Sequence, residues 1–276
     1  MNEGETMDLH KALTLAKTLR HRFLLPTKAH EEAFLRNENA SALTYGETVF
    51  LLDCEDSCDL YFATENPEEL PEAFAALRMQ GPKGRNFAVH ATESAETAGA
   101  IDSVLPLLKE AGCSIREEYI AFHTKKPLSE FAIQSDAVRM MREKEGYLVY
   151  SMALVLLDEA KFAMSYEAFE RFANAKDSVC LVLEDEGIVK GFAMGKVYGR
   201  PNEKSLFVRG MGVERTYQGF GISKLLLGAL FKWGMEKGAQ SSMLWVEQKN
   251  IRAIGLYERF AYVPYGDREV VLTFKT

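Results

Sequence analysis

Histidine is missing from the second half of this chain. All five histidines of the 276 residues precede residue 130: His10, His21, His30, His90 and His123. A Ser-His or Cys-His nucleophilic site built within residues 131–276 is therefore excluded, and so is a histidine metal site there. Acid-base chemistry in that half has to use Tyr, Glu, Asp, Cys, Lys or water.

Long apolar runs are also lacking. The best candidate, Met152 to Leu157, is far shorter than the roughly 18 to 20 residues of a membrane span, so no membrane partner is expected. The acidic start, residues 1–5, is not typical of a secretory signal. We therefore expect a cytoplasmic protein whose four cysteines are reduced thiols.

The sequence contains no set of residues with the spacing of metal ligands. Cys54 and Cys58 are separated by three residues, but no histidine or further cysteine lies close enough to complete a site. This spacing favours the tip of a hairpin, and no metal is expected.

A basic block is absent as well. Residues 1–130 carry 13 Lys and Arg against 22 Asp and Glu, a net charge of −9, and the remainder has a net charge of +2. No nucleic-acid partner is expected from this distribution, and the near-neutral half is the better place for an anionic ligand.

What the second half does contain is a glycine-rich stretch, Gln218-Gly219-Phe220-Gly221-Ile222-Ser223. An apolar run, 206–213, precedes it, and an apolar stripe with steps of three and four follows it as far as Trp233. The pattern predicts a strand, a tight turn and a helix. Unpaired N–H groups and the positive end of the helix dipole at such a turn suit a phosphate, although a simple tight turn also requires glycine.

The two halves repeat one order of predicted elements: helices, hairpin, helix, strand, helix, strand. This is an α/β layout, and the polar stretch 125–129 predicts domains at 1–127 and 128–276. In the first half, Glu65-Asn66-Pro67-Glu68 stands where the second has its glycine turn. Helices are predicted at 9–25, 136–143 and 152–172, the last broken near 163–165.

The second half resembles the GNAT superfamily of N-acetyltransferases over about residues 178–274. Residues 218–223 resemble the family's Gln/Arg-x-x-Gly-x-Gly/Ala loop, with Ser223 in place of the usual small residue. Residues 208–213 resemble the strand before that loop. Leu244-Trp245-Val246, followed by Asn250, Ala253, Leu256, Tyr257 and Phe260, resembles a second motif, with Ala261-Tyr262 where Gly-Phe is common.

The resemblance implies a GNAT-like mixed central sheet flanked by helices (α/β or α+β), in two tandem GNAT-like domains. The first would be degenerate and the second catalytic. It implies acetyl-CoA, or another acyl-CoA, in a cleft between the strands that end at Val213 and Val246. The donor-binding residues that it implies are Met211, Gly212, Val213, Gln218, Gly219, Phe220, Gly221, Ile222, Ser223 and Asn250.

Within that set, backbone groups of Met211 and Val213 would pair with the pantetheine arm, and N–H groups of 219–223 would hold the pyrophosphate. Tyr257 matches the tyrosine that protonates the departing thiolate, although it is also suited to core packing. Asn250 is equally suited to capping a helix. The general base is expected at Glu247, with Glu214 and Glu184 as alternatives, and Cys180 is expected to be a buried strand residue.

The predicted function is acetyl transfer to a primary amine of a small molecule or peptide, by direct attack on the thioester. The alternative is a non-catalytic acyl-CoA-binding regulatory protein. A third interpretation places the function in the first half, through His90 or His123. The acceptor is not readable from the sequence, although the acidic half favours a cationic amine, and a homodimer is left open.

Overall fold

The computed structural model describes residues 5–25, 28–54, 58–157, 164–200 and 202–276. The chain forms two compact units: residues 1–120 with 266–276 make unit 1, and residues 121–265 make unit 2. This division differs from the predicted boundary at 127, because residues 266–276 belong to unit 1. Strands β7 (Ser114–Thr124) and β13 (Tyr262–Lys275) each contribute residues to both units.

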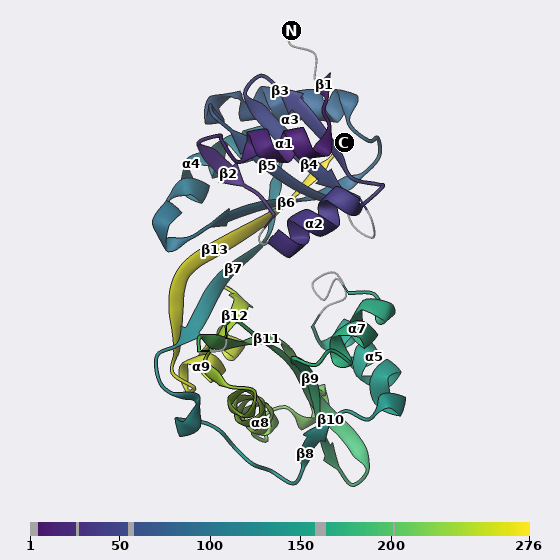
Figure 1. Cartoon of the computed structure of the whole chain (residues 1–276), viewed down its shortest axis with the longest axis vertical. Helices are drawn as coiled ribbons and strands as arrows, with labels where there is room; N and C mark the ends of the chain where they lie inside the picture. The colour runs from purple at the N-terminus through teal and green to yellow at the C-terminus, as the bar shows by residue number, and fades with distance from the viewer. Residues whose placement is uncertain (1–4, 26–27, 55–57, 158–163, 201) are drawn as a thin grey trace. The chain divides into compact units, whose positions relative to one another are not determined.

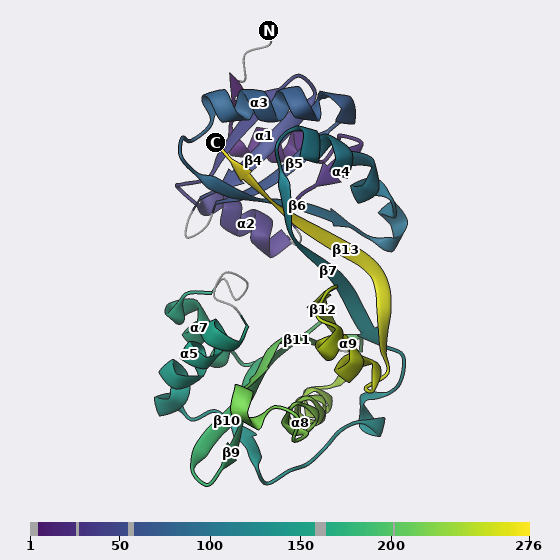
Figure 2. The same ribbon diagram turned by 180° about the vertical axis from the view of Figure 1, so that it is seen from behind.

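Unit 1 is a mixed sheet with helices on both faces (Figures 1 and 2). Its strands follow the order β1-β3-β4-β5-β6-β13, in which only β5 and β6 are a parallel pair among the recorded registers. The strands are β1 (Glu5–Thr6), β2 (His21–Phe23), β3 (Ser41–Tyr45), β4 (Thr48–Asp53), β5 (Asp59–Thr64) and β6 (Asn86–Glu93). The helices are α1 (Leu9–Ala16), α2 (Lys28–Arg36), α3 (Leu70–Gln80) and α4 (Ala100–Glu110).

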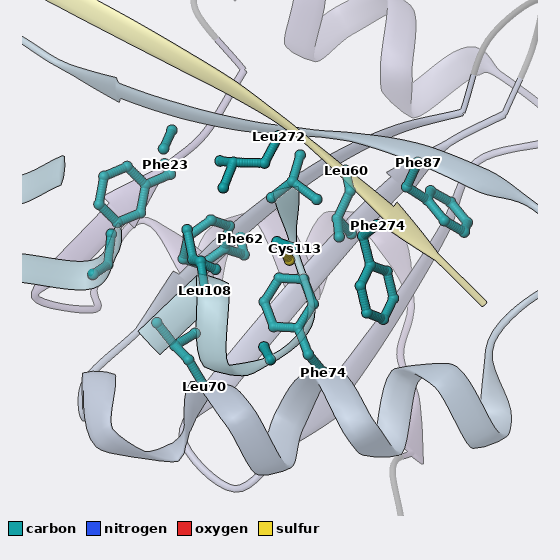
Figure 3. Packing of buried hydrophobic residues seen from close by; sticks show 14 of the residues in the cluster. Phe23, Leu60, Phe62, Leu70, Phe74, Phe87, Leu108, Cys113, Leu272 and Phe274 are labelled. Carbon is teal, nitrogen blue, oxygen red and sulfur yellow. The ribbon is translucent and has the colours of Figure 1, made fainter. Parts of the chain in front are cut away.

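The main core of unit 1 lies between the sheet and helices α3 and α4 (Figure 3). Phe74 of α3 meets Phe50, Phe62 and Phe274 edge to face, with ring centroids 5.1, 6.0 and 5.0 Å away. All four rings are buried. Burial of each such side chain stabilises the fold by about 1.5–3 kcal/mol, which makes this aromatic cluster the centre of unit 1.

The predicted helix over 9–25 is wrong beyond residue 16. Helix α1 ends at Ala16, and residues 21–23 form strand β2, which pairs with β5. Phe23 lies opposite Phe62 with ring centroids 4.8 Å apart, and its side chain is 1% exposed. Helical spacing indicated an extension of α1, but burial of Phe23 in the core overrides that local preference (Figure 3).

Unit 2 contains the sheet β12-β11-β10-β9-β8, antiparallel except for the parallel pair β11 and β12. Helix α8 covers one face, and α5 and α7 cover the other (Figure 1). The strands are β8 (Val138–Met140), β9 (Ser178–Asp185), β10 (Ile188–Tyr198), β11 (Lys204–Val213) and β12 (Ala239–Glu247). The helices are α5 (Gly146–Leu156), α7 (Tyr166–Ala173), α8 (Ile222–Glu236) and α9 (Ile251–Glu258).

Glycines of β10 and β11 let the helices approach the sheet closely. A Cβ on Gly195 would lie 2.9 Å from Leu230 of α8, and a Cβ on Gly212 would lie 3.0 Å from Leu156 of α5. The mixed sheet flanked by helices confirms the predicted fold class. Within the described residues, no helix is long and apolar enough to cross a membrane.

The predicted helix over 136–143 is wrong, because residues 138–140 form β8, which pairs with β9. Arg139 fixes this edge. It donates to the Glu145 carboxylate at 2.7 and 2.8 Å and also bonds Glu184. The predicted break at 163–165 lies partly outside the described residues, and Ser165 caps α7 by accepting a bond from Ala168 N–H at 3.3 Å.

Replacing Arg139 with Met should lower the unfolding free energy of unit 2 by about 1–3 kcal/mol, because Glu145 and Glu184 lose their closest cation and keep only Arg142, at 3.4 and 3.5 Å. The hydrogen bonds from Arg139 lower the pKa of Glu145 from 4.5 to about 2. A lowered folded-state pKa gives stability that is present above pH 4.5 and is lost as the pH falls towards 2. The difference between wild type and Arg139→Met should therefore shrink across that range.

Urea unfolding followed by tryptophan fluorescence measures this, since both tryptophans, Trp233 and Trp245, lie in unit 2. Arg171→Met, which removes an exposed arginine of α7 in unit 2, is the control and should change stability by less than about 0.5 kcal/mol. If Arg139→Met lowers the unfolding free energy by the same amount at every pH, the stabilising role of the ion pair between Arg139 and Glu145 is contradicted.

Candidate active site at the divergence of two parallel strands

Strands β11 and β12 separate part of the way along their length. Their recorded register runs from Lys204 opposite Ala239 to Phe207 opposite Met243. Both strands continue beyond this point, β11 to Val213 and β12 to Glu247. Within the described residues, no other strand pairs with this edge of β11. A gap lined by backbone therefore opens between the ends of the two strands.

The hydrogen-bond pattern of β11 shows which groups face the gap. Glu214 N–H donates to the Lys190 carbonyl of β10 at 2.9 Å. In an antiparallel ladder, bonded and non-bonded pairs alternate, so Gly212 and Gly210 bond to β10. The N–H and C=O groups of Met211 and Val213 then point away from β10, towards the gap.

Gln218 ties the end of β11 to the loop and to α9. Its side-chain Nε2 donates to the Val213 carbonyl at 2.9 Å, and its Oε1 accepts from Arg252 Nη1 at 2.5 Å. No sequence pattern predicts this link to Arg252, which is 34 residues further along the chain. It brings a guanidinium to the glycine loop.

The loop itself presents unpaired N–H groups. Gly219 and Gly221 have φ of +92° and +80°, a left-handed backbone that glycine adopts most readily. Among the described residues, no acceptor is recorded for the N–H groups of 219–223. A Cβ on either glycine would have nothing within 4 Å, and Phe220 is exposed, so the loop is open to a ligand. This arrangement suits a phosphate.

Helix α9 follows β12 and places Tyr257 beside the core. Asn250 caps the helix by accepting a bond from Ala253 N–H at 3.1 Å, as predicted for a capping role. Tyr257 packs edge to face on Tyr262, with ring centroids 5.6 Å apart. Its hydroxyl has no recorded hydrogen bond among the described residues, and burial raises its pKa to about 12. The phenol therefore stays protonated and can donate a proton.

The candidate bases lie in three different settings. Glu247 ends β12 at the rim of the gap, and Glu214 directly follows β11; both are half-buried. Glu184 lies on β9, two strands away from β11, where hydrogen bonds from Arg139 lower its pKa. Its engagement with Arg139 and its distance from the gap count against Glu184 as the base.

The other sequence candidates lie elsewhere. Cys180 is buried in β9, as predicted, and burial raises its pKa to about 12. Cys54 and Cys58 flank the β4–β5 hairpin, whose turn at 55–57 lies outside the described residues. The described residues contain no group of three or more side chains suited to a metal.

His90 is held between two carboxylates in unit 1. Its ring nitrogens lie 3.1 Å from Asp59 and 2.8 Å from Glu269. Burial alone would lower its pKa, but these hydrogen bonds raise it to about 9. Both nitrogens are engaged, so His90 is poorly suited to act as a base. His123 packs on Tyr265, with ring centroids 4.9 Å apart.

A hollow of about 490 Å³ lies in unit 2, next to residues 124–129 and the first residues of β12. The glycine loop and α9 adjoin the other end of β12. The hollow is therefore distinct from the candidate active site, which lies at the opposite end of β12.

Unit 1 has the same divergence of parallel strands, but its gap is filled. Strands β5 and β6 pair only from Asp59 and Leu60 to Ala88 and Val89, although both strands continue. Because β4 occupies one edge of β5, strand β2 pairs along the other edge and also contacts β6. The chain's own residues 21–23 thus lie where unit 2 has an open edge.

Comparisons with known proteins agree with this geometry. The sequence profile of the acetyltransferase (GNAT) family matches residues 147–262. A GCN5-related N-acetyltransferase from Sphaerobacter thermophilus is 13% identical and has a TM-score of 0.62, over 98% of this chain and 94% of that chain. An acetyltransferase of the GNAT family from Colwellia psychrerythraea is 13% identical with a TM-score of 0.56, over 99% of both chains.

A tandem GNAT protein from the clavulanic acid biosynthesis pathway is 14% identical with a TM-score of 0.60, over 99% of this chain and 98% of that chain. At these identities the solved structures show the fold alone. No curated protein matches the chain. Residues 147–262 are a GNAT acetyltransferase domain, and the whole chain has the fold of tandem GNAT proteins.

Proposed function

We propose that the chain is an acetyl-CoA-dependent N-acetyltransferase that acts on a primary amine of a small molecule or peptide. The observation that carries this proposal is a set of backbone groups with no recorded partner among the described residues: N–H and C=O of Met211, N–H of Val213, and the N–H groups of 219–223. Such a set suits a donor with an amide-bearing arm and a pyrophosphate, and GNAT proteins typically use acetyl-CoA.

In this proposal Met211 and Val213 bind the pantetheine amides through their backbone N–H and C=O groups, with Gly212 between them. Residues 219–223 bind the pyrophosphate, and the Gln218 side chain keeps the loop at the end of β11. Asn250 lies two residues before Arg252, which supports a place beside the donor phosphates in addition to its capping bond.

The reaction forms a bond between the amine nitrogen and the acetyl carbon and breaks the carbon–sulfur bond. The ammonium must first lose a proton, for which we propose Glu247, directly or through a water. The departing thiolate must gain a proton, for which we propose Tyr257, and the second proton that the attacking nitrogen releases then restores the phenol. A phenol keeps its proton at neutral pH, and burial raises the pKa of Tyr257 further, so the proton is present when the thiolate forms.

We also propose that only residues 128–276 form the catalytic domain and that residues 1–127 are a degenerate counterpart. Strand β2 supports this, because it occupies the edge of β5 that a donor would need. The start of α3 supports it too. Glu65, Glu68 and Glu69 lie there, and carboxylates disfavour a phosphate at a helix start.

The four cysteines are free thiols, which agrees with the reducing cytoplasm that we propose as the compartment.

The alternative function, an acyl-CoA-binding regulator that catalyses no reaction, differs from the proposed enzyme in one measurable way. The proposed enzyme should release free thiol from acetyl-CoA when a panel of primary amines is added. A regulator should bind acetyl-CoA but release no thiol above the rate without amine.

Replacing Gly221 with Ala should weaken acetyl-CoA binding by about tenfold or more, because the left-handed backbone at φ +80° is strained by a Cβ. Isothermal titration calorimetry should give one site per chain for the wild type, since unit 1 is filled by β2. Two sites per chain would contradict the degenerate assignment of residues 1–127.

The matched control is Gly99→Ala. Gly99 precedes α4 in unit 1 with φ +88°, and a Cβ there would also have nothing within 4 Å. This variant imposes the same backbone strain and should leave the affinity for acetyl-CoA unchanged. An equal loss of affinity in both variants would show that the effect comes from general destabilisation.

Replacing Tyr257 with Phe should lower kcat by about 100-fold or more while the Kd for acetyl-CoA stays within about twofold, because only the proton donor is lost. Stopped-flow or coupled thiol detection measures kcat. Tyr265→Phe, which removes an exposed phenol of unit 2, is the control. Unchanged turnover in Tyr257→Phe would refute the acid assignment.

A further inference from the structure

Arg209 occupies a β-bulge next to the gap. In the β10–β11 register, Gly195 lies opposite Val208 and Met194 lies opposite Gly210, so Arg209 has no residue opposite it. A bulge bends its strand and re-aims the side chain it carries. The bulge falls two residues after Phe207, where the pairing of β11 with β12 ends.

The side chains of β11 alternate between the two faces of the sheet. Leu206 contacts Gly234 of α8, and Gly210 faces α5, because a Cβ there would lie 2.8 Å from Leu157. Val208 is buried and shares the face of Leu206. The bulge breaks this alternation, so the surroundings of Arg209 decide its face. Its guanidinium interacts with Tyr198, whose ring lies 6.4 Å from that of Phe207 on the α5 face.

Strand β12 presents Trp245 and Glu247 on the same face. Ser242 lies opposite Leu206 on the α8 face, and Leu244 and Val246 continue that buried row. Trp245 and Glu247, which alternate with them, are half-buried on the α5 face. The proposed base thus shares a face with Arg209, across the gap between the strands.

Arg209 forms no ion pair within the part of the chain that the structure describes. Among the described residues, no carboxylate lies within 4.0 Å of its guanidinium, and the side chain is exposed. Its guanidinium lies close enough to Tyr198 for an electrostatic interaction. Lys196, on the same face, lies over the Tyr198 ring at 4.9 Å. Two cationic side chains, Arg209 and Lys196, therefore share this face with Glu247, which lies across the gap.

We propose that Arg209 binds a carboxylate of the acceptor, so that the acceptor class is a primary amine that also carries a carboxylate, such as an amino acid. This inference rests on the proposed function, because it places the acceptor between Arg209 and Glu247, the proposed base. A guanidinium has the planar fork that matches a carboxylate with two parallel hydrogen bonds. Arg209 and Glu247 would then orient the two ends of one acceptor.

A phosphate of the donor is a poorer ligand for Arg209. The pyrophosphate loop begins after Val213, about 13 Å along the strand from Arg209 at ~3.3 Å per residue. The charge of the first half, which favours a cationic amine, does not conflict with this acceptor. An amino acid carries an ammonium and a carboxylate, and each would meet a group of opposite charge.

The test uses the full chain with a panel of α- and β-amino acids, each measured beside its carboxamide. The wild type should prefer the carboxylate of a pair by about tenfold or more in kcat/KM. In Arg209→Met, kcat/KM for the carboxylate should fall by about 10- to 100-fold, and that for the carboxamide by less than threefold. The KM for acetyl-CoA should not change, and Arg209→Lys should restore part of the loss.

Arg171→Met, which removes an exposed arginine of α7, is the control and should behave as wild type. Equal use of carboxylates and carboxamides by the wild type, or an equal loss for both in Arg209→Met, would overturn the inference while the proposed function stands. Absence of thiol release with every amine would instead overturn the proposed function.

If no amine causes thiol release, isothermal titration calorimetry with N-acetyl amino acids and their carboxamides still tests the role of Arg209. Binding that prefers the carboxylate and is lost in Arg209→Met supports it. Binding that ignores the carboxylate, or no binding at all, overturns it.

Discussion

The divergence of β11 from β12 is the constraint on which the rest of the site depends. While the strands are paired, up to Phe207 and Met243, their backbone groups satisfy each other. Beyond that point the groups of Met211 and Val213 face a gap, and only the Val213 carbonyl has a recorded partner, the side chain of Gln218. Backbone groups left unpaired in this way favour a ligand that can complete the ladder. The same divergence brings the loop after β11 close to α9.

The two units show two outcomes of one strand arrangement. In unit 1 the diverging strands enclose the chain's own β2, and Phe23 joins the aromatic core through its contact with Phe62. In unit 2 the same edge is open, and the two glycines of the loop keep the helix start accessible. Burial of β2 contributes to the stability of unit 1, whereas the open edge of unit 2 leaves polar groups unsatisfied until a ligand binds. We regard this difference as a division between structural and functional roles.

The features predicted from sequence were those that local chemistry determines. The positive φ of Gly219 and Gly221, the apolar stripe of α8 and the Asn250 cap each depend on neighbouring residues, and the structure contains them. Features set by distant partners were missed. Residues 21–23 and 138–140 became strands because β5 and β9 offered edges to them. The Gln218–Arg252 bond and the bulge at Arg209 depend on packing and register, for which the sequence carries no local pattern.

A crystal structure of the full chain with acetyl-CoA tests the central claim most directly, because it locates the donor relative to both divergent strand pairs. We expect one donor per chain, with its pyrophosphate on the N–H groups of 219–223 and its amides paired with Met211 and Val213. The Tyr257 hydroxyl should lie within hydrogen-bond distance of the sulfur, at about 3.5 Å. A donor bound in unit 1, or one in unit 2 whose sulfur lies far from Tyr257, would contradict the account.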